Sequence, residues 1–179
     1  MNIFVLDTDP IEAARMYCDK HVPKMVVELL QQLGSAAIRH GATPEQMPLT
    51  KKGTPLKGGY HNHPCTVWCG ESNANYSWAF LHAIELCKQY TIRFNKTHFC
   101  ETGIRQLFDL MPLIPIGKLT PFALAMPDEH RPIDIDIVYH ARGDDAVQAY
   151  RRYYHTKQFA KWDKDIPAPD WWQGVEVIA

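Results

Sequence analysis

The sequence predicts a mainly α-helical fold in one compact domain, with minor β content and long proline-rich irregular segments. Apolar residues recur at helical spacing in three long stretches, whereas strict alternation is confined to one short stretch. The length of 179 residues suits one domain with a full hydrophobic core. Five of the 13 prolines lie between positions 112 and 132 and two more at 167 and 169, where they interrupt regular structure.

Composition and charge narrow the class of protein. Apolar residues make up 46% and charged residues 22%, as in a soluble globular chain. The net charge of −1 gives no overall attraction to nucleic acid, so any contact with phosphate has to be local. The first residues do not resemble a signal peptide, and no apolar run reaches the roughly 20 residues that span a bilayer. We therefore expect a cytoplasmic protein without membrane contact, whose five cysteines are reduced and structural.

The first part of the chain predicts a strand followed by a broken helix. Residues 2–7, NIFVLD, are short and apolar, as a strand is. Asp9 is then the expected N-cap of a helix that has Pro10 at its first position. Pro23 should kink or split this helix, and Gly34 should end it.

One edge of that helix carries groups suited to a ligand. Tyr17, His21, Lys24 and Glu28 follow one another at steps of four, three and four residues, beside the apolar face. A histidine at such an edge can bind phosphate or act as acid or base near neutral pH, and a lysine adds a positive charge. The alternative is an exposed ion pair of Lys24 with Glu28 and a surface histidine.

Residues 41–60 predict a mobile loop. They combine glycine, proline, threonine and lysine without helical or strand periodicity, and the composition gives the segment little to bury. We expect this loop to order over a bound ligand as a lid.

The stretch GGYHNHPCTVWCGESNANYSW, residues 58–78, concentrates histidine, cysteine and tryptophan. His61, His63, Cys65 and Cys69 offer donors that zinc accepts, but their spacing differs from the paired knuckles of common zinc modules. We predict no metal at the cysteines, which should alternate with Val67 into the core. A site that joins His63 to histidines elsewhere stays open. Both histidines should face outward from a rigid turn.

A second long helix is predicted from Ser72 or Asn73 to Asn95, with a clear apolar face. A polar stripe runs along another side at steps of three and four residues. This stripe is either a solvated face or a partly covered one, and the tryptophan at its head favours cover because its large ring is unfavourable in water. The stripe consists of Trp78, His82, Glu85, Gln89 and Arg93.

The C-terminal third predicts irregular and aromatic structure. Residues 111–132 should form a packed irregular segment, and the alternation in PIDIDIVYH, residues 132–140, is typical of an exposed strand. A last helix should begin at Gly143 and run to about Trp162, followed by an extended aromatic tail over 163–179. Cations interleaved with aromatic rings in this region suit a ligand with a phosphate and a stackable base.

Four stretches together resemble a family of small proteins encoded by tailed bacteriophages: DTDPIEAARMYCDKHVPKMVVE, NHPCTVWCGESNANYSW, TPFALAMPDEH and AYRRYYHTKQFAKW with the later PDWW. The similarity spans almost the whole chain. It implies a viral source and the cytoplasm of an infected bacterium, and it assigns no reaction.

We therefore expect a protein that binds a phosphorylated, base-containing small molecule of nucleotide type, most simply to sequester a host defence signal. The first alternative is an enzyme on a similar ligand, with His21, His63 or His98 as acid or base. The second is a DNA-acting modification or repair protein, which the neutral charge favours less. The sequence lacks a Walker loop, a GxGxxG motif and the HxE with PCxxC of deaminases, although a histidine mechanism needs none of these.

The candidate ligand contacts come from segments far apart in the chain. His63, His21 and Arg151 should share one pocket around the phosphate-bearing part of the ligand, while Trp68 or Trp171 stacks on its base. No cofactor is predicted, and a homo-oligomer is left open. The full candidate set is His21, Lys24, His61, His63, Trp68, Asn75, Arg93, His98, Arg151, Tyr154, Lys157 and Trp171.

Overall fold

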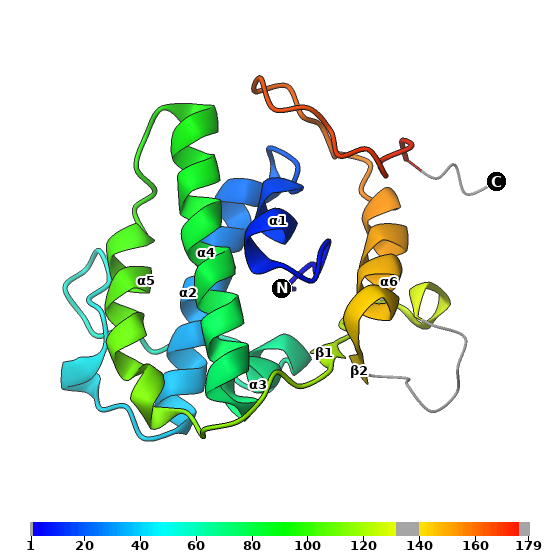
Figure 1. Cartoon of the computed structure of the whole chain (residues 1–179). Coiled ribbons are helices and arrows are strands. Elements are labelled where there is room, and N and C mark those ends of the chain that lie inside the picture. The colour runs from blue at the N-terminus through cyan, green and yellow to red at the C-terminus, as the bar shows by residue number, and fades with distance from the viewer. Residues whose placement is uncertain (1, 132–139, 176–179) are drawn as a thin grey trace.

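Helices dominate the computed structural model, which describes residues 2–131 and 140–175 (Figure 1). The mainly α prediction is confirmed. The α-helices are α1 (Pro10–Arg15), α2 (His21–Arg39), α3 (Pro64–Glu71), α4 (Asn73–Phe94), α5 (Glu101–Leu107) and α6 (Gly143–His155). Short 3-10 turns are η1 (Pro44–Gln46), η2 (Phe108–Leu113) and η3 (Asp128–His130). Strands β1 (Phe122–Ala123) and β2 (His140–Ala141) pair antiparallel, with Phe122 opposite Ala141.

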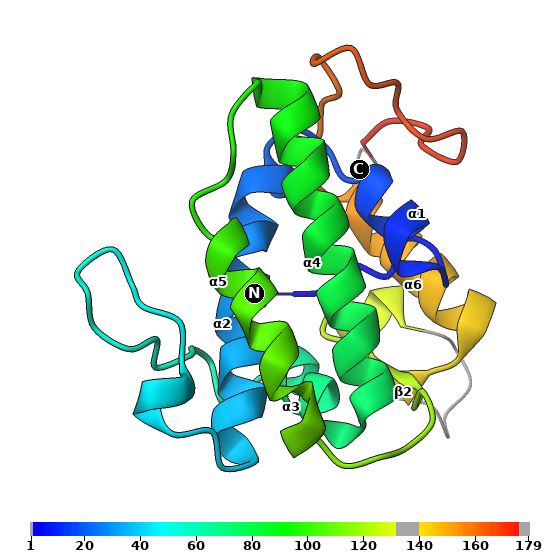
Figure 2. The same ribbon diagram turned by 60° about the vertical axis from the view of Figure 1, so that its left-hand side comes forward.

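The helices surround the N-terminal stretch. α2 and α4 pack against each other, α1 packs on α4, and α3 packs on α2. α6 stands on the other side of the N-terminal stretch, and the tail after it passes over the end of the molecule near α1 (Figures 1 and 2). Within the described ranges, no helix combines the length and apolar character needed to cross a membrane.

Residues 2–6 are not the predicted strand. They are buried but belong to no sheet. They lie among helices, so their polar groups bond largely to side chains: the Phe4 N–H donates to the Tyr17 hydroxyl over 2.8 Å, and Arg151 Nε donates to the Leu6 carbonyl over 3.0 Å. The apolar run therefore indicated correctly that this segment is buried, but the strand that we predicted from it is wrong.

The first helix is broken, but before the predicted place. The break spans residues 16–20, and Pro23 lies in the first turn of α2, where its missing N–H removes no helical bond. Gly34 does not end α2, which runs on to Arg39. The glycine is explained by a close approach instead, since a Cβ there would lie 2.8 Å from the Leu56 side chain.

The loop at 41–60 is tied down at its end. The Ser35 hydroxyl on α2 donates to the Gly59 carbonyl over 2.9 Å and accepts its N–H over 2.8 Å. Gly58 has φ +68, and a Cβ there would lie 2.2 Å from the Ser35 hydroxyl. Met47 is buried, so this segment has more to bury than its composition indicated.

The cysteine-containing stretch is a helix, not the alternating segment that we predicted. α3 begins after its N-cap His63, and Cys65 and Cys69 lie one turn apart on its buried side, whereas Val67 between them is only partly buried. By contrast, the prediction for α4 is confirmed: the Ser72 hydroxyl accepts the Asn75 N–H, and Asn95 closes the helix in the left-handed region at φ 52.

In the C-terminal third, residues 111–131 pack irregularly around η2 and β1 as predicted, with Ile114, Leu124 and Met126 buried. Most of the strand predicted at 132–140 lies outside the described residues; only His140 is described, and it belongs to β2. α6 ends at His155, seven residues before the predicted end. The tail folds back so that Trp172 stacks on the His155 ring at 4.8 Å, while residues 176–179 lie outside the described part.

Candidate functional site

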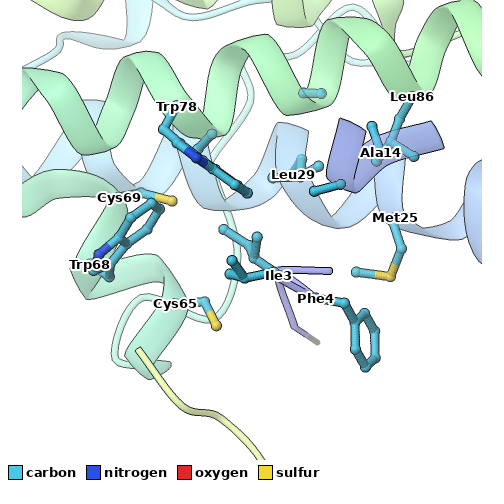
Figure 3. Close-up of a cluster of buried hydrophobic side chains, with 14 of the residues drawn as sticks. Ile3, Phe4, Ala14, Met25, Leu29, Cys65, Trp68, Cys69, Trp78 and Leu86 are labelled. Carbon is cyan, nitrogen blue, oxygen red and sulfur yellow. The ribbon is translucent and has the colours of Figure 1, made fainter. Parts of the chain in front are cut away.

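Trp68 is a core residue. It is 2% exposed and packs edge-to-face on Trp78, with ring centroids 5.8 Å apart, and against Phe122 at 5.2 Å. Figure 3 shows both tryptophans among the buried side chains that surround Ile3. No face of the Trp68 indole is left for a base, so the structure corrects the stacking role that we gave it.

Asn75 and His98 also hold the fold together. The buried Asn75 amide donates to the Trp68 carbonyl over 2.8 Å and accepts the Thr120 N–H over 2.9 Å. His98 Nδ1 accepts the Cys100 N–H, so its Nε2 carries the proton and donates to the Pro23 carbonyl over 3.1 Å. The polar atoms of both side chains are therefore occupied by hydrogen bonds within the fold. Neither side chain lines the pocket that contains His21.

The polar stripe of α4 is covered completely, which excludes its reading as a solvated face. The N-terminal stretch and α1 lie over it, and every member is at most 6% exposed. Trp78 donates to the Thr8 carbonyl over 2.8 Å, and His82 Nδ1 donates to the Pro10 carbonyl over 2.8 Å. Arg93 donates to the Tyr17 carbonyl over 2.6 Å, so it is a structural cation, not the ligand contact that we predicted.

Three other predicted residues come together in one pocket. His21 and Lys24 at the start of α2 face Lys157 just after α6, across a hollow of about 230 Å³ that we call the α2–α6 pocket. The remaining wall comes from the N-terminal stretch, α2, the segment after β1, and the end of α6 with the residues beyond it. These are Asn2, Phe4, Met25, Glu28, Ala125, Tyr153 and Phe159.

Buried tyrosine hydroxyls fix the N-terminal wall of this pocket. The Tyr17 hydroxyl bonds the Phe4 backbone, and the Tyr150 hydroxyl donates to the Ala123 carbonyl over 2.6 Å and lies 3.1 Å from Asn2 Oδ1. Burial raises the pKa of both hydroxyls well above the usual value, so they remain neutral. Asn2 and Phe4 are thereby held at the pocket without a sheet.

The orientation of His21 follows from its bond to Tyr154. The Tyr154 hydroxyl accepts the Cys18 N–H over 3.0 Å and lies 2.7 Å from His21 Nδ1. In the tautomer in which this hydroxyl donates to Nδ1, the imidazole proton is on Nε2. Nε2 makes no hydrogen bond within the described residues, and His21 lines the pocket, so this N–H is available to a ligand.

Burial and neighbouring lysines keep His21 neutral. Desolvation, followed by the positive charges of Lys24, Lys157 and Lys20, lowers its pKa to about 3. All three ammonium groups are therefore close enough to act on one imidazole. Phe4 stacks on the ring at a centroid distance of 4.9 Å, and Phe159 meets it edge-on at 5.0 Å.

His63 lies near the opposite wall. Its Nδ1 accepts the Cys65 N–H over 3.2 Å at the start of α3. Burial lowers its pKa, while the charge of Glu28 works in the other direction. Because Glu28 lines the α2–α6 pocket, His63 is close to it, but His63 is not part of its lining.

Arg151 and Trp171 line a different pocket. This hollow of about 550 Å³ lies between the tail and α1, with Arg15 and Met16 on its far side. The Arg151 guanidinium lies over the Trp171 ring at 5.2 Å, and its Nη2 is 3.8 Å from Asp7 Oδ2. The single pocket predicted for His63, His21 and Arg151 is therefore wrong.

His61 lies at a third place. It is exposed and borders an apolar hollow of about 580 Å³ formed by the end of α2 and the 41–60 loop. That loop contributes no residue to the α2–α6 pocket, so it is not placed as a lid over it.

The cysteines and metal donors offer no alternative centre within the described ranges. All five cysteines are buried and free. Desolvation raises the pKa of Cys65 to about 11, which disfavours the thiolate that a metal or a nucleophilic mechanism needs. No group of three or more histidine, cysteine, aspartate or glutamate side chains in residues 2–131 and 140–175 is placed to hold a metal ion.

Sequence reasoning missed several residues of the pocket. Phe159 and Tyr153 belong to the mixed aromatic and basic stretch that we noted, so composition pointed to their neighbourhood. Asn2 and Phe4 gave no such signal, because the Glu28 carboxylate that accepts the Asn2 N–H and the Tyr17 hydroxyl that bonds Phe4 are distant in sequence.

Comparison of the chain with protein-family models, curated proteins and solved structures finds no match.

Proposed function

We propose that the α2–α6 pocket binds a phosphorylated, base-containing small molecule of nucleotide type. In this proposal the protein is phage-encoded and sequesters a host defence signal in the bacterial cytoplasm. The observation that carries it is the gathering of Lys20, Lys24 and Lys157 around one neutral imidazole, that of His21, which lines the pocket and whose Nε2 makes no hydrogen bond within the described residues. N–H donors and ammonium groups are the partners that phosphate oxygens prefer.

Aromatic rings beside these donors suit the other half of such a ligand. Phe159 is 36% exposed, and Tyr153 lines the same pocket. The volume of about 230 Å³ is below the roughly 300 to 1,000 Å³ of pockets that enclose a whole ligand. The pocket therefore holds the phosphate end, and the base lies along the open rim.

The same geometry favours binding over acid–base catalysis. A general base near neutral pH needs a lone pair and a pKa close to that pH. In the tautomer that offers the Nε2–H to a ligand, His21 has no lone pair at that atom, and burial lowers the pKa of the ring to about 3. The alternative, a histidine-dependent hydrolase, would require the bound ligand to reverse both conditions.

Calorimetry with a panel of nucleoside mono-, di- and triphosphates tests the proposal. At least one should bind, and Lys157→Gln should weaken it about tenfold or more, because a hydrogen bond to a charged group contributes roughly 1.5 to 3 kcal/mol. Lys52→Gln removes the same charge from the exposed loop and should leave affinity unchanged.

His21 needs a pair of variants, because an alanine would also leave a cavity. His21→Asn can keep the bond to Tyr154 but loses the Nε2–H, whereas His21→Gln can place its amide near the Nε2 position. We expect weaker binding for His21→Asn than for His21→Gln. Heat release of bound ligand should return it intact; altered ligand would support the enzyme, and no binding across the panel would overturn the proposal.

A further inference from the structure

The charges around the α2–α6 pocket are unbalanced. Lys24 pairs with Glu28 at 3.4 Å. Lys20 and Lys157 form no ion pair within residues 2–131 and 140–175. Their ammonium groups rest on aromatic rings instead, Lys20 at 4.6 Å from the Phe159 centroid and Lys157 at 3.3 Å from that of Tyr153.

The histidines do not change this balance. Burial lowers the pKa of both His21 and His63, so neither ring adds a positive charge near pH 7. Lys24, Glu28 and Lys157 are the charged side chains that line the pocket. Lys20, the N-cap of α2, lies beside the pocket on the ring of its lining residue Phe159, close enough to act on His21. The surplus is therefore the two positive charges of Lys20 and Lys157.

We propose that this surplus selects a terminal phosphate monoester, which carries two negative charges, over a phosphodiester, which carries one. The inference rests on the proposed function and names the class of ligand for the same pocket. A dianion pairs with both free ammonium groups and accepts the Nε2–H of His21. A diester would leave one ammonium group without a counter-charge beside a partly desolvated anion.

The N-terminal end of α2 supports the same preference. The helix has 19 residues and begins at His21. Its N-cap residue, Lys20, makes no side-chain hydrogen bond to the backbone of the first turn. The helix dipole places partial positive charge at this end, which favours a more negative ligand.

Matched ligands test the inference: each of the four ribonucleoside 5′-monophosphates and the methyl ester of the same phosphate. At pH 7.5 the monophosphate should bind about tenfold or more tightly than its methyl ester. The second phosphate pKa is about 6, so the difference should shrink to about threefold or less at pH 5. Steric exclusion of the methyl group would instead keep the difference constant with pH and would overturn the inference.

Variants locate the effect. Lys20→Gln and Lys157→Gln should each reduce the ratio between monophosphate and methyl ester, whereas Lys52→Gln should not. Equal binding of both ligands at pH 7.5 would refute the dianion preference and leave the proposed function standing. Absence of binding by any ligand of either kind would overturn the dianion preference, and absence of binding by the di- and triphosphates as well would overturn the proposed function.

Discussion

Replacing Arg93 by methionine should lower the free energy of unfolding by about 3 to 5 kcal/mol, the range found when one partner of a buried ion pair is removed. The guanidinium is fully buried and donates four hydrogen bonds, to the carbonyls of Arg15 and Tyr17, to Asp19 and to Gln89. Methionine fills most of the aliphatic volume, so the loss reports the orphaned acceptors more than a cavity.

The size of the effect depends on the hydrogen-bond acceptors that lose their donor when Arg93 is removed. Desolvation lowers the pKa of Arg93, against the opposing attraction of Asp19, so the ion pair itself contributes little net stability. The two carbonyls, however, lie at the break between α1 and α2, where helical bonding does not satisfy them. Without Arg93 the buried Tyr17 carbonyl and the partly buried Arg15 carbonyl are short of a donor, which costs about 1 to 3 kcal/mol for a fully buried group.

Urea unfolding followed by tryptophan fluorescence measures the effect, with Arg105→Met as the matched control. Arg105 is 57% exposed and pairs with Glu101 on the surface, so its loss should cost less than about 1 kcal/mol. A loss below about 1 kcal/mol for Arg93→Met would refute the account of the buried stripe. Under conditions where the variant is folded, its nucleotide affinity should stay within about threefold, because Arg93 does not line the α2–α6 pocket.

Further predictions concern pH, backbone and thiols. Burial lowers the pKa of His21 to about 3 and that of His82 to about 4, so the unfolded chain binds more protons below about pH 6.5. Stability should therefore fall by up to about 2 kcal/mol per histidine from pH 6.5 to 5 in urea unfolding, and His82→Gln should remove its share of the slope. Gly58→Ala should destabilise by more than Gly53→Ala, since both glycines have positive φ but only Gly58 meets a neighbour, Ser35; equal melting temperatures would contradict this contact. The five buried cysteines should react with a thiol reagent only as fast as the protein opens, and fast labelling of native protein would show that a thiol is accessible.

Local chemistry was sufficient to predict α4. Ser72 supplies the cap, apolar spacing supplies the periodicity, and Asn95 can adopt the left-handed conformation that ends the helix. All three signals lie within the segment or next to it. For the same reason Asp9 correctly marked the start of α1, where its carboxylate accepts the Ile11 N–H over 2.7 Å.

The sequence of a helix alone does not show whether its polar face is covered by another segment of the chain. The α4 stripe has the spacing of a solvated face, and its burial depends on residues 4–19, whose backbone carbonyls accept its Trp78, His82 and Arg93 donors. A helix whose polar groups bond to another segment's backbone has the same periodicity as one bonded to water. The tryptophan at the head of the stripe was the one local indication, since burying its ring is strongly favourable.

Helical geometry explains why only part of the predicted site lies in one pocket, with His21 and Lys157 together and Arg151 elsewhere. The prediction put Arg151 beside His21 because each borders an apolar face, yet neighbours on a helix face are set by rotation of about 100° per residue. Tyr153, two residues on, therefore points about 200° away from Arg151, and the two residues line pockets on opposite sides of α6. Tyr154 points between these two directions, is fully buried, and forms its hydrogen bond with Nδ1 of His21. A ligand in the α2–α6 pocket is accordingly separated from Arg151 by the body of α6, so Arg151→Gln should leave nucleotide affinity unchanged where Lys157→Gln weakens it; a tenfold loss in the Arg151 variant would place the ligand on the other side of the helix.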